Sequence, residues 1–101
     1  MISEDLKQKV KDKLSVTWND EYTDRKIETM MEDAKAELDH ILGAETDYSA
    51  PGMERSLYLE YCLYIWNGIK EEFKKEYIQD IYMIRHKNEV KAYEAKGENV
   101  Q

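Results

Sequence analysis

The sequence has few residues that break helices or cross-link the chain. Of its 101 residues, one is proline, four are glycine and one is cysteine. So few breakers favour helices over a succession of short strands, and we predict an all-α fold. The single cysteine, Cys62, can form no disulfide within the chain, which favours a reducing cytoplasm.

Long hydrophobic runs and an excess of positive charge are also missing. The most apolar segment ends at the charged residues 70–75 and falls short of the roughly 18 residues that a membrane span requires. No pattern of a secretory signal peptide opens the chain, so we expect no membrane association. The 22 acidic and 15 basic residues give a net charge of −7, which repels nucleic acid phosphates. We therefore predict no specific DNA binding.

Two segments before residue 44 have helical periodicity. Ser3 is a good N-cap for a short helix whose apolar residues recur every four positions. Residues 15–20 should run extended, with Trp18 as their buried anchor. A second helix begins after Asp20 or Thr23 and ends at Gly43, because its apolar residues follow a 3.6-residue period. These residues are Ile27, Met30, Met31, Ala34, Leu38, Ile41 and Leu42.

A third helix is expected from about Met53, after the loop of residues 44–52. It is apolar nearly all round between Leu57 and Trp66, which predicts a central helix with neighbours on several sides. Tyrosine keeps a polar tip, so aromatic residues here fit a rim where the core meets another subunit. The subunit-interface candidates are Tyr58, Tyr61, Tyr64, Trp66, Tyr77 and Tyr82.

The last helix is expected to end near Tyr93, and it either follows the third helix separately or continues it as one long bent helix. We predict a small bundle of about four helices with a long C-terminal helix, a single domain over residues 1–94 and a flexible tail over residues 95–101.

No constellation of residues indicates catalysis. Glu37 and His40 have the i, i+3 spacing of half a helical carboxylate metal site, but a second such pair is missing. Cys62 lies in the most apolar part of the chain, where a thiol is a core residue and not a nucleophile. Phosphate-binding loops, nucleophile elbows and paired cysteines are absent from the sequence. We predict no enzyme, no cofactor and no metal.

Basic residues gather only near the end of the last helix. Arg85, His86, Lys87 and Lys91 suit a helix C-terminus, where cations oppose the helix dipole. They are too few to overcome the net charge of −7. A helix-turn-helix would need a recognition helix with an exposed Arg, Gln and Asn face, and the sequence has none.

The order of the elements resembles the small head-tail connector proteins of tailed bacteriophages and prophages, also called adaptor or head-completion proteins. The resemblance extends from Leu6 to Glu89. It depends most on the aromatic run "YLEYCLYIWNG" followed by "EEFKKEYIQDI". These segments are similar to the family's Tyr-Cys-rich helix, its Phe flanked by acids and its Tyr-led last helix.

The resemblance implies a structural subunit that forms a ring, usually twelvefold, beneath the portal protein. Such a ring extends the DNA channel, lets DNA pass without specific binding and docks the next stopper or tail connector. It would assemble in the host bacterial cytoplasm and remain at the head-tail junction of the virion. The acidic residues Glu28, Glu32 and Asp39 are candidates for lining the channel. The C-terminal segment would reach the portal, with Arg85, Lys87, Lys91 and Tyr93 as contact candidates.

A second interpretation is a small cytoplasmic binding or regulatory module. In that case the groove between the second and third helices would receive a partner helix.

Overall fold

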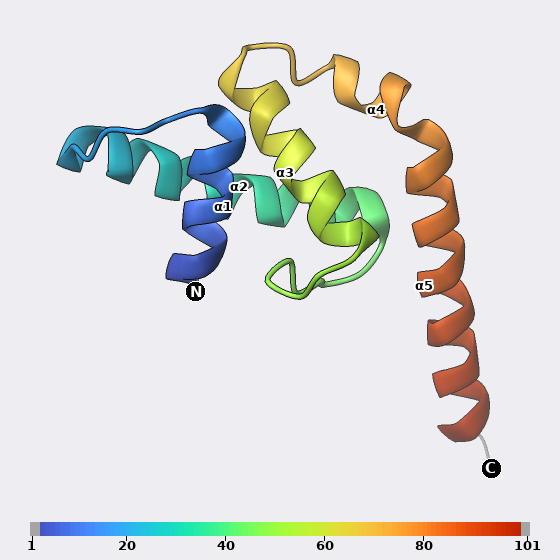
Figure 1. The fold of residues 1–101 in the computed structure, drawn as a ribbon. Coiled ribbons are helices and arrows are strands. Elements are labelled where there is room, and N and C mark those ends of the chain that lie inside the picture. Colours follow the sequence, from blue (N-terminus) through green and yellow to red (C-terminus); the bar gives the residue numbers. More distant parts are fainter. Residues whose placement is uncertain (1–2, 100–101) are drawn as a thin grey trace.

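The computed structural model describes residues 3–99, and 76% of these residues are helical. Within this range there is no strand, so the predicted all-α class is confirmed. Five helices follow one another along the chain (Figure 1). They are α1 (Glu4–Leu14), α2 (Glu21–Leu42), α3 (Met53–Trp66), the short α4 (Glu72–Glu76) and α5 (Ile78–Asn99).

Helix α1 begins as its sequence predicts. The Ser3 hydroxyl accepts a hydrogen bond from the Leu6 amide at 3.1 Å, which satisfies one of the free amides of the first turn. After Ser15 the chain is extended, but its buried residue is Val16 and not Trp18, which is 53% exposed. The predicted anchor was therefore wrong. The small β-branched side chain enters the core, while the indole lies on the surface and its Nε1 donates to Thr23 Oγ1 at 3.4 Å.

Helix α2 is the longest element of the core. Asp20 is its N-cap, and its carboxylate accepts from the Thr23 amide at 3.2 Å. Gly43 ends the helix in the left-handed conformation, at φ 80°, which a residue with a side chain rarely adopts. The predicted stripe is confirmed from end to end. Five of its seven members are buried: Ile27, Met31, Ala34, Leu38 and Leu42.

Helix α3 packs against both α1 and α2, which explains its apolar circumference. The Tyr58 hydroxyl donates to the carbonyl oxygen of Met31 at 2.7 Å, so the ring is buried without leaving its polar tip unpaired. Tyr48, from the loop between α2 and α3, stacks on Tyr58 with ring centroids 4.6 Å apart. This helix is central, as its composition predicts.

The chain breaks after α3 and does not form one long bent helix. Gly68 adopts a left-handed conformation at φ 75°, and α4 then turns the chain into α5. Phe73 of α4 is fully buried, and Ile81 and Ile84 dock α5 onto the body of α1, α2 and α3. Helix α5 continues to Asn99, beyond the predicted end near Tyr93, because nothing but good helix formers follows Tyr93 up to Lys96. The flexibility predicted for residues 95–101 stays a prediction.

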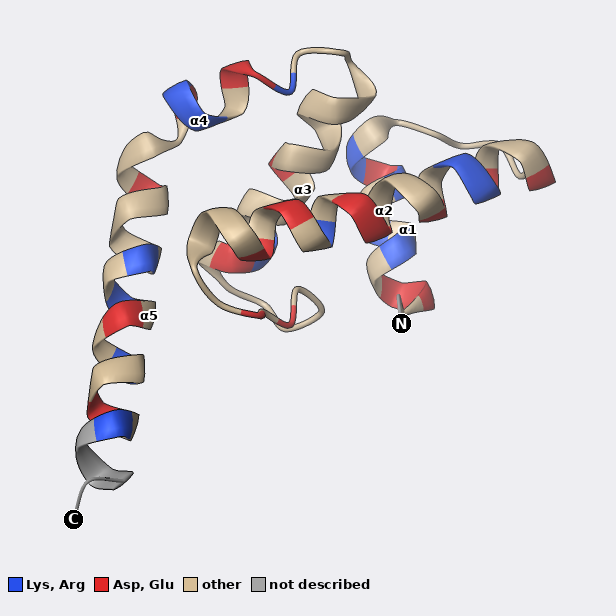
Figure 2. Ribbon diagram, turned by 180° about the vertical axis from the view of Figure 1, so that it is seen from behind, with Lys and Arg blue, Asp and Glu red and all other residues tan. Residues whose placement is uncertain are grey.

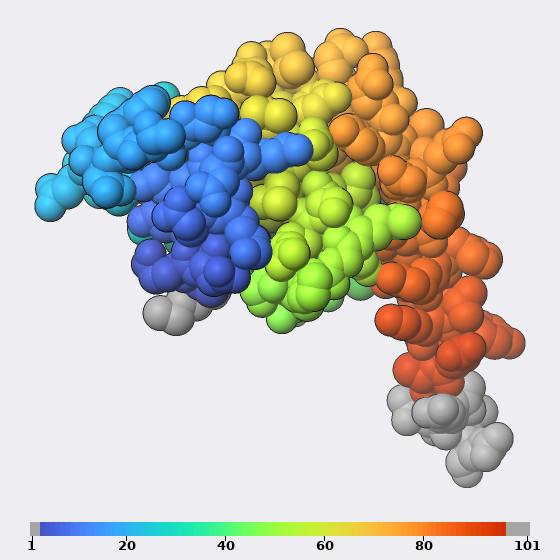
Figure 3. Space-filling model, in the orientation of Figure 1, coloured from blue at the N-terminus to red at the C-terminus, as the bar shows by residue number. Residues whose placement is uncertain are grey.

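The second half of α5 stands away from the body. Figures 1 and 3 show it as an arm that leaves the side of the molecule and ends far from the N-terminus. The molecule is accordingly elongated, with extents of 54 × 28 × 19 Å. Among the helices of residues 3–99, none is long and apolar enough to cross a membrane.

Candidate functional site

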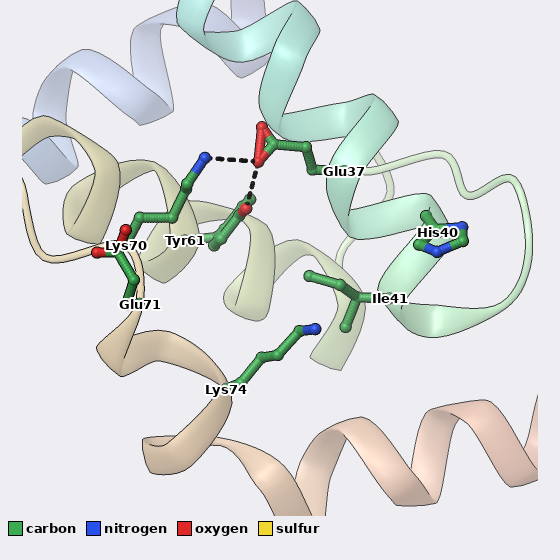
Figure 4. A pocket seen from close by; sticks show the side chains of 7 residues that line it. All are labelled: Glu37, His40, Ile41, Tyr61, Lys70, Glu71 and Lys74. Atoms are coloured by element: carbon green, nitrogen blue, oxygen red, sulfur yellow. Dashed lines mark hydrogen bonds and ion pairs between the residues drawn. The ribbon is translucent and has the colours of Figure 1, made fainter.

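A groove of about 420 Å³ lies between α2, α3 and α4 (Figure 4). Its floor is apolar, formed by Ile41 and the ring of Tyr61. Seven residues line it: Glu37, His40, Ile41, Tyr61, Lys70, Glu71 and Lys74. Lys74 reaches from α4 towards Ile41, while His40 lies at the opposite end of the groove from Tyr61.

Glu37 occupies one end of this groove and is already bonded. Its Oε1 accepts from the Tyr61 hydroxyl at 2.7 Å and from Lys70 Nζ at 3.1 Å. The Tyr61 hydrogen bond, and then Lys70, lower the pKa of Glu37. Burial and the Glu37 carboxylate raise the pKa of Tyr61. The carboxylate therefore stays ionised and ties α2 to α3 and to the loop before α4, which leaves it unsuited to act as a base.

The same bonds bear on the half metal site suggested by the spacing of Glu37 and His40, because they already occupy the Glu37 carboxylate. The two side chains do not converge in Figure 4. Within the described residues, no group of three or more His, Cys, Asp and Glu side chains is placed to hold a metal ion. Burial raises the pKa of the Cys62 thiol to about 12, which fits the interpretation of Cys62 as a core residue.

The groove continues along α5 as a second hollow of about 340 Å³. The two hollows share His40, Ile41 and Lys74. The second one adds the apolar side chains Ile78, Ile81 and Tyr82 and the guanidinium of Arg85. The whole groove therefore combines an apolar floor with a mainly cationic rim, on a chain that is acidic overall.

Three polar side chains fasten α5 at the end of this groove. Arg85 Nη1 donates to the carbonyl of Ile41 at 3.1 Å, and Asn88 Nδ2 donates to the carbonyl of Leu42 at 2.8 Å. Both bonds satisfy carbonyls in the last turn of α2 that have no partner within the helix. Lys87 Nζ lies 2.6 Å from Glu54 Oε2 on α3 and lowers the pKa of that carboxyl. Two of the predicted portal contacts, Arg85 and Lys87, thus have partners within the chain.

The remaining portal candidates lie on the free half of α5. Lys91 is exposed and Tyr93 is 79% exposed. Tyr93 belongs to a set of exposed residues that share one side of the helix, which we call the outer face of α5. Its members are Tyr82, Met83, His86, Val90 and Tyr93.

The tyrosines predicted for the subunit interface divide into buried and exposed residues. Tyr58 and Tyr61 are only 1% and 3% exposed, so both belong to the core of a single chain. That corrects the prediction for these two, whose hydroxyls find partners on α2. Tyr82 is 65% exposed and remains available to a partner.

The other three aromatic candidates are half-buried. Tyr64 and Tyr77 meet edge to face with centroids 6.0 Å apart, and both pack on Phe73. Burial is the main cause that raises the pKa of Tyr77 to about 12. Trp66 lies beneath Lys26, whose Nζ is 5.3 Å from the ring centroid. These residues cover the core and expose only an edge.

The acidic residues proposed for a channel also differ from one another. Asp39 accepts from the Tyr48 hydroxyl at 2.7 Å, from Lys35 Nζ at 2.7 Å and from the Thr46 amide at 3.2 Å. It holds the loop between α2 and α3 and is only partly exposed, and its role as a channel-lining residue stays a prediction. Glu28 lies 2.7 Å from Lys7 of α1, and Glu32 is exposed.

Several functional candidates have no signal in the sequence. Lys70 and Lys74 reach the groove from elements far along the chain from Glu37, and no local spacing predicts that meeting. Met83 and Val90 are exposed although they are apolar. Tyr22, at the start of α2, is exposed as well.

Comparison of the chain with protein-family models, with curated proteins and with solved structures gave no match. The function is therefore inferred from the residues and their arrangement.

Proposed function

We propose that this protein acts by binding other protein chains, as a head-tail connector subunit of a tailed bacteriophage or prophage. Its copies would form a ring beneath the portal, extend the DNA channel and dock the next stopper or tail connector. The observation that carries the proposal is the free half of α5, which extends as an arm (Figure 3) and carries Val90 and Tyr93, both left exposed by the described residues. The resemblance over Leu6 to Glu89 supplies the identity of the assembly.

The surfaces divide between two tasks in this proposal. The outer face of α5 would contact the portal through its exposed Val90 and Tyr93, and Lys91, on another side of the same arm, would add a cationic contact. The exposed Glu32, with Glu28 beside it on α2, would face the channel. Carboxylates at that position repel phosphates and let DNA slide, in keeping with the net charge of −7.

The test is to mix the full chain with the portal protein encoded in the same genome and to examine the mixture by electron microscopy and mass photometry. We expect an added ring of density at one end of the portal. Tyr93→Asp should abolish that ring, because it places a charge in the apolar contact. Ala92→Asp is the matched control, since it adds the same charge to the neighbouring position on a different side of α5.

Folded wild-type protein that leaves the portal bare at about 10 μM, a concentration at which specific interfaces are ordinarily occupied, would count against the connector. If Tyr93→Asp and Ala92→Asp both abolish the added ring, the outer face of α5 is not the surface that contacts the portal.

A second candidate function is a helical binding module, and the groove along α2, α4 and α5 favours it. This groove lies beside α4 and α5 and has α3 only at its floor, so it differs from the predicted groove between the second and third helices. Its apolar floor and the cations Lys70, Lys74 and Arg85 suit an acidic amphipathic helix. Lys74→Glu should weaken the binding of such a partner helix to the groove and leave portal binding unchanged.

A further inference from the structure

Four residues of the outer face of α5 form a heptad pattern. Met83, His86, Val90 and Tyr93 follow one another at intervals of three, four and three residues, the spacing of a and d positions in a coiled coil. All four side chains are exposed. Because successive residues turn by about 100° around a helix, the residues that dock α5 on the body, Ile81 and Ile84 among them, lie on the opposite side. The helix therefore carries a second stripe of exposed and mainly apolar residues that points away from the body.

The part of α5 beyond Asn88, which carries Val90 and Tyr93, has no buried residue as far as Lys96. Every residue from Glu89 to Lys96 is exposed, and the polar bonds to α2 end at Asn88. Isolated helices shorter than about 12–15 residues are marginal in water, so a helical arm of this kind gains stability from a partner that covers it.

The charges beside the stripe indicate what that partner is. Lys87 and Glu94 flank it on one side, and Glu89 and Lys96 flank it on the other. Figure 2 shows positive and negative residues alternating along this part of α5. In an antiparallel pair with Val90 packed against Tyr93 of a second copy, Glu89 would face Lys96 of that copy. Lys87, which pairs with Glu54 of its own body, would lie beside Glu94 of the second copy. Both flanks would then carry opposite charges.

A parallel pair of the same helices is disfavoured. Its flanking contacts would place Glu89 of one copy beside Glu94 of the other, two carboxylates in contact on each side of the pair.

We propose that two copies of this chain associate through an antiparallel pairing of their α5 helices, with Val90 of each copy packed against Tyr93 of the other at the centre of the seam. The two-fold axis would pass between Lys91 and Ala92. Since Ile81 and Ile84 dock the body on the side of α5 opposite Val90 and Tyr93, the two bodies would lie on the outer sides of the helix pair. The same patch is used on both copies, as a two-fold interface requires.

This pairing goes beyond the connector proposal and does not depend on it. It would cover Tyr93, which the connector proposal assigns to the portal, so the free dimer and the portal complex would compete for one surface. Sedimentation of the protein alone tests the pairing, whereas the portal mixture tests the connector.

The decisive experiment is a charge exchange at Glu89 and Lys96, neither of which contacts the body. Sedimentation equilibrium of the wild-type chain should show a reversible monomer–dimer equilibrium. Glu89→Lys alone places two lysine pairs across the interface, and Lys96→Glu alone places two glutamate pairs there. We expect each to weaken dimerisation about tenfold or more. Both should retain the thermal unfolding of the wild type.

Pairing should return in two ways. The double variant Glu89→Lys with Lys96→Glu restores opposite charges within a homodimer. An equimolar mixture of the two single variants restores them in a heterodimer, because every flanking pair then joins a lysine to a glutamate. The mixture should therefore dimerise where neither variant does alone.

Three results would overturn the proposal. The first is a wild-type chain that remains monomeric up to about 1 mM, where even weak specific association is visible. The second is a mixture that associates no better than its components. The third is tighter pairing of Glu89→Lys alone, because only a parallel dimer gains when a lysine replaces Glu89 opposite Glu94.

Discussion

The body of the molecule and the free half of α5 contain similar residues, but the body buries them and the free half of α5 exposes them. In the body, apolar and aromatic side chains of α1, α2 and α3 cover one another, and the hydroxyl of Tyr58 finds a carbonyl partner at 2.7 Å. In the free half of α5, Val90 and Tyr93 are 40% and 79% exposed, on a part of the helix that stands away from the body. One chain therefore contains a core whose apolar side chains are buried and an arm whose apolar side chains are exposed.

This difference separates stability from function. Burial of apolar area drives folding at about 25 cal/mol per Å², so the body holds nearly all the stability that this small chain can have. The arm contributes little to folding, and its apolar residues gain only when another chain covers them. Substitutions in the two regions should accordingly affect different measurements.

The largest effect is expected in the body. Leu38 is fully buried on α2, and Leu38→Ala removes apolar contacts and leaves a cavity, which costs about 2–5 kcal/mol of unfolding free energy. Tyr93→Ala in the arm should change the unfolding free energy by less than about 0.5 kcal/mol. Urea unfolding at low protein concentration measures both. A comparable loss for the two variants would show that the arm is part of the core.

A smaller effect is expected where the two regions join. Asn88→Ala deletes the bond to the Leu42 carbonyl, and a part-buried hydrogen bond of this kind contributes about 0.5–1.5 kcal/mol. Amide hydrogen exchange in the first turns of α5 should become faster, while exchange in α3 stays as in the wild type.

The matched control for that variant is Glu89→Ala, at the adjacent but exposed position. It should leave exchange in the first turns of α5 unchanged. If both variants accelerate exchange equally, Asn88 is not what fastens the helix.

The body was more predictable from the sequence than the arm. Helix α2 has strong local signals, because Asp20, Gly43 and the stripe around Met31 all agree on its limits and its buried side. In α5 the apolar residues lie on two opposite sides, Ile81 and Ile84 on one and Met83 and Val90 on the other. Periodicity cannot say which side is covered when both are apolar.

Tyr58 and Tyr61 were wrongly predicted to lie at a subunit interface for a related reason. Whether a tyrosine is buried depends on the element that comes to lie against it, and no sequence spacing linked Tyr58 to Met31 or Tyr61 to Glu37. Trp18 shows the same limit in the other direction, since its size suggested an anchor while the smaller Val16 fitted the core.

The bond between Glu37 and Tyr61 predicts a pH dependence that arises in the body. The pKa of Glu37 is lower in the folded chain than its ordinary value of 4.5. Its carboxylate therefore stabilises the fold above pH 4.5, and this contribution disappears as the pH falls through the lower folded value. Glu37→Gln should flatten part of the acid limb when the midpoint of thermal unfolding is followed from about pH 6 to pH 3.

Tyr61→Phe gives an independent check, because it removes the donor and keeps the ring. It should flatten the same part of the profile. Identical acid limbs in wild type and Glu37→Gln would mean that other carboxylates set the pH dependence.

The last test makes the same substitution once in the body and once in the arm, and the effect in the arm is expected to be the smallest of all. Replacing alanine by glycine inside a helix costs about 1 kcal/mol of helix stability because glycine has more backbone freedom to lose. At Ala34, fully buried in α2, that cost should appear in the unfolding free energy together with the lost packing of the methyl group. At Ala92 the same change should lower the helical circular dichroism signal slightly and leave the urea midpoint unchanged, because melting the arm does not melt the body. A shift of the midpoint by Ala92→Gly would show that the arm and the body unfold together, which the exposure of every residue from Glu89 to Lys96 argues against.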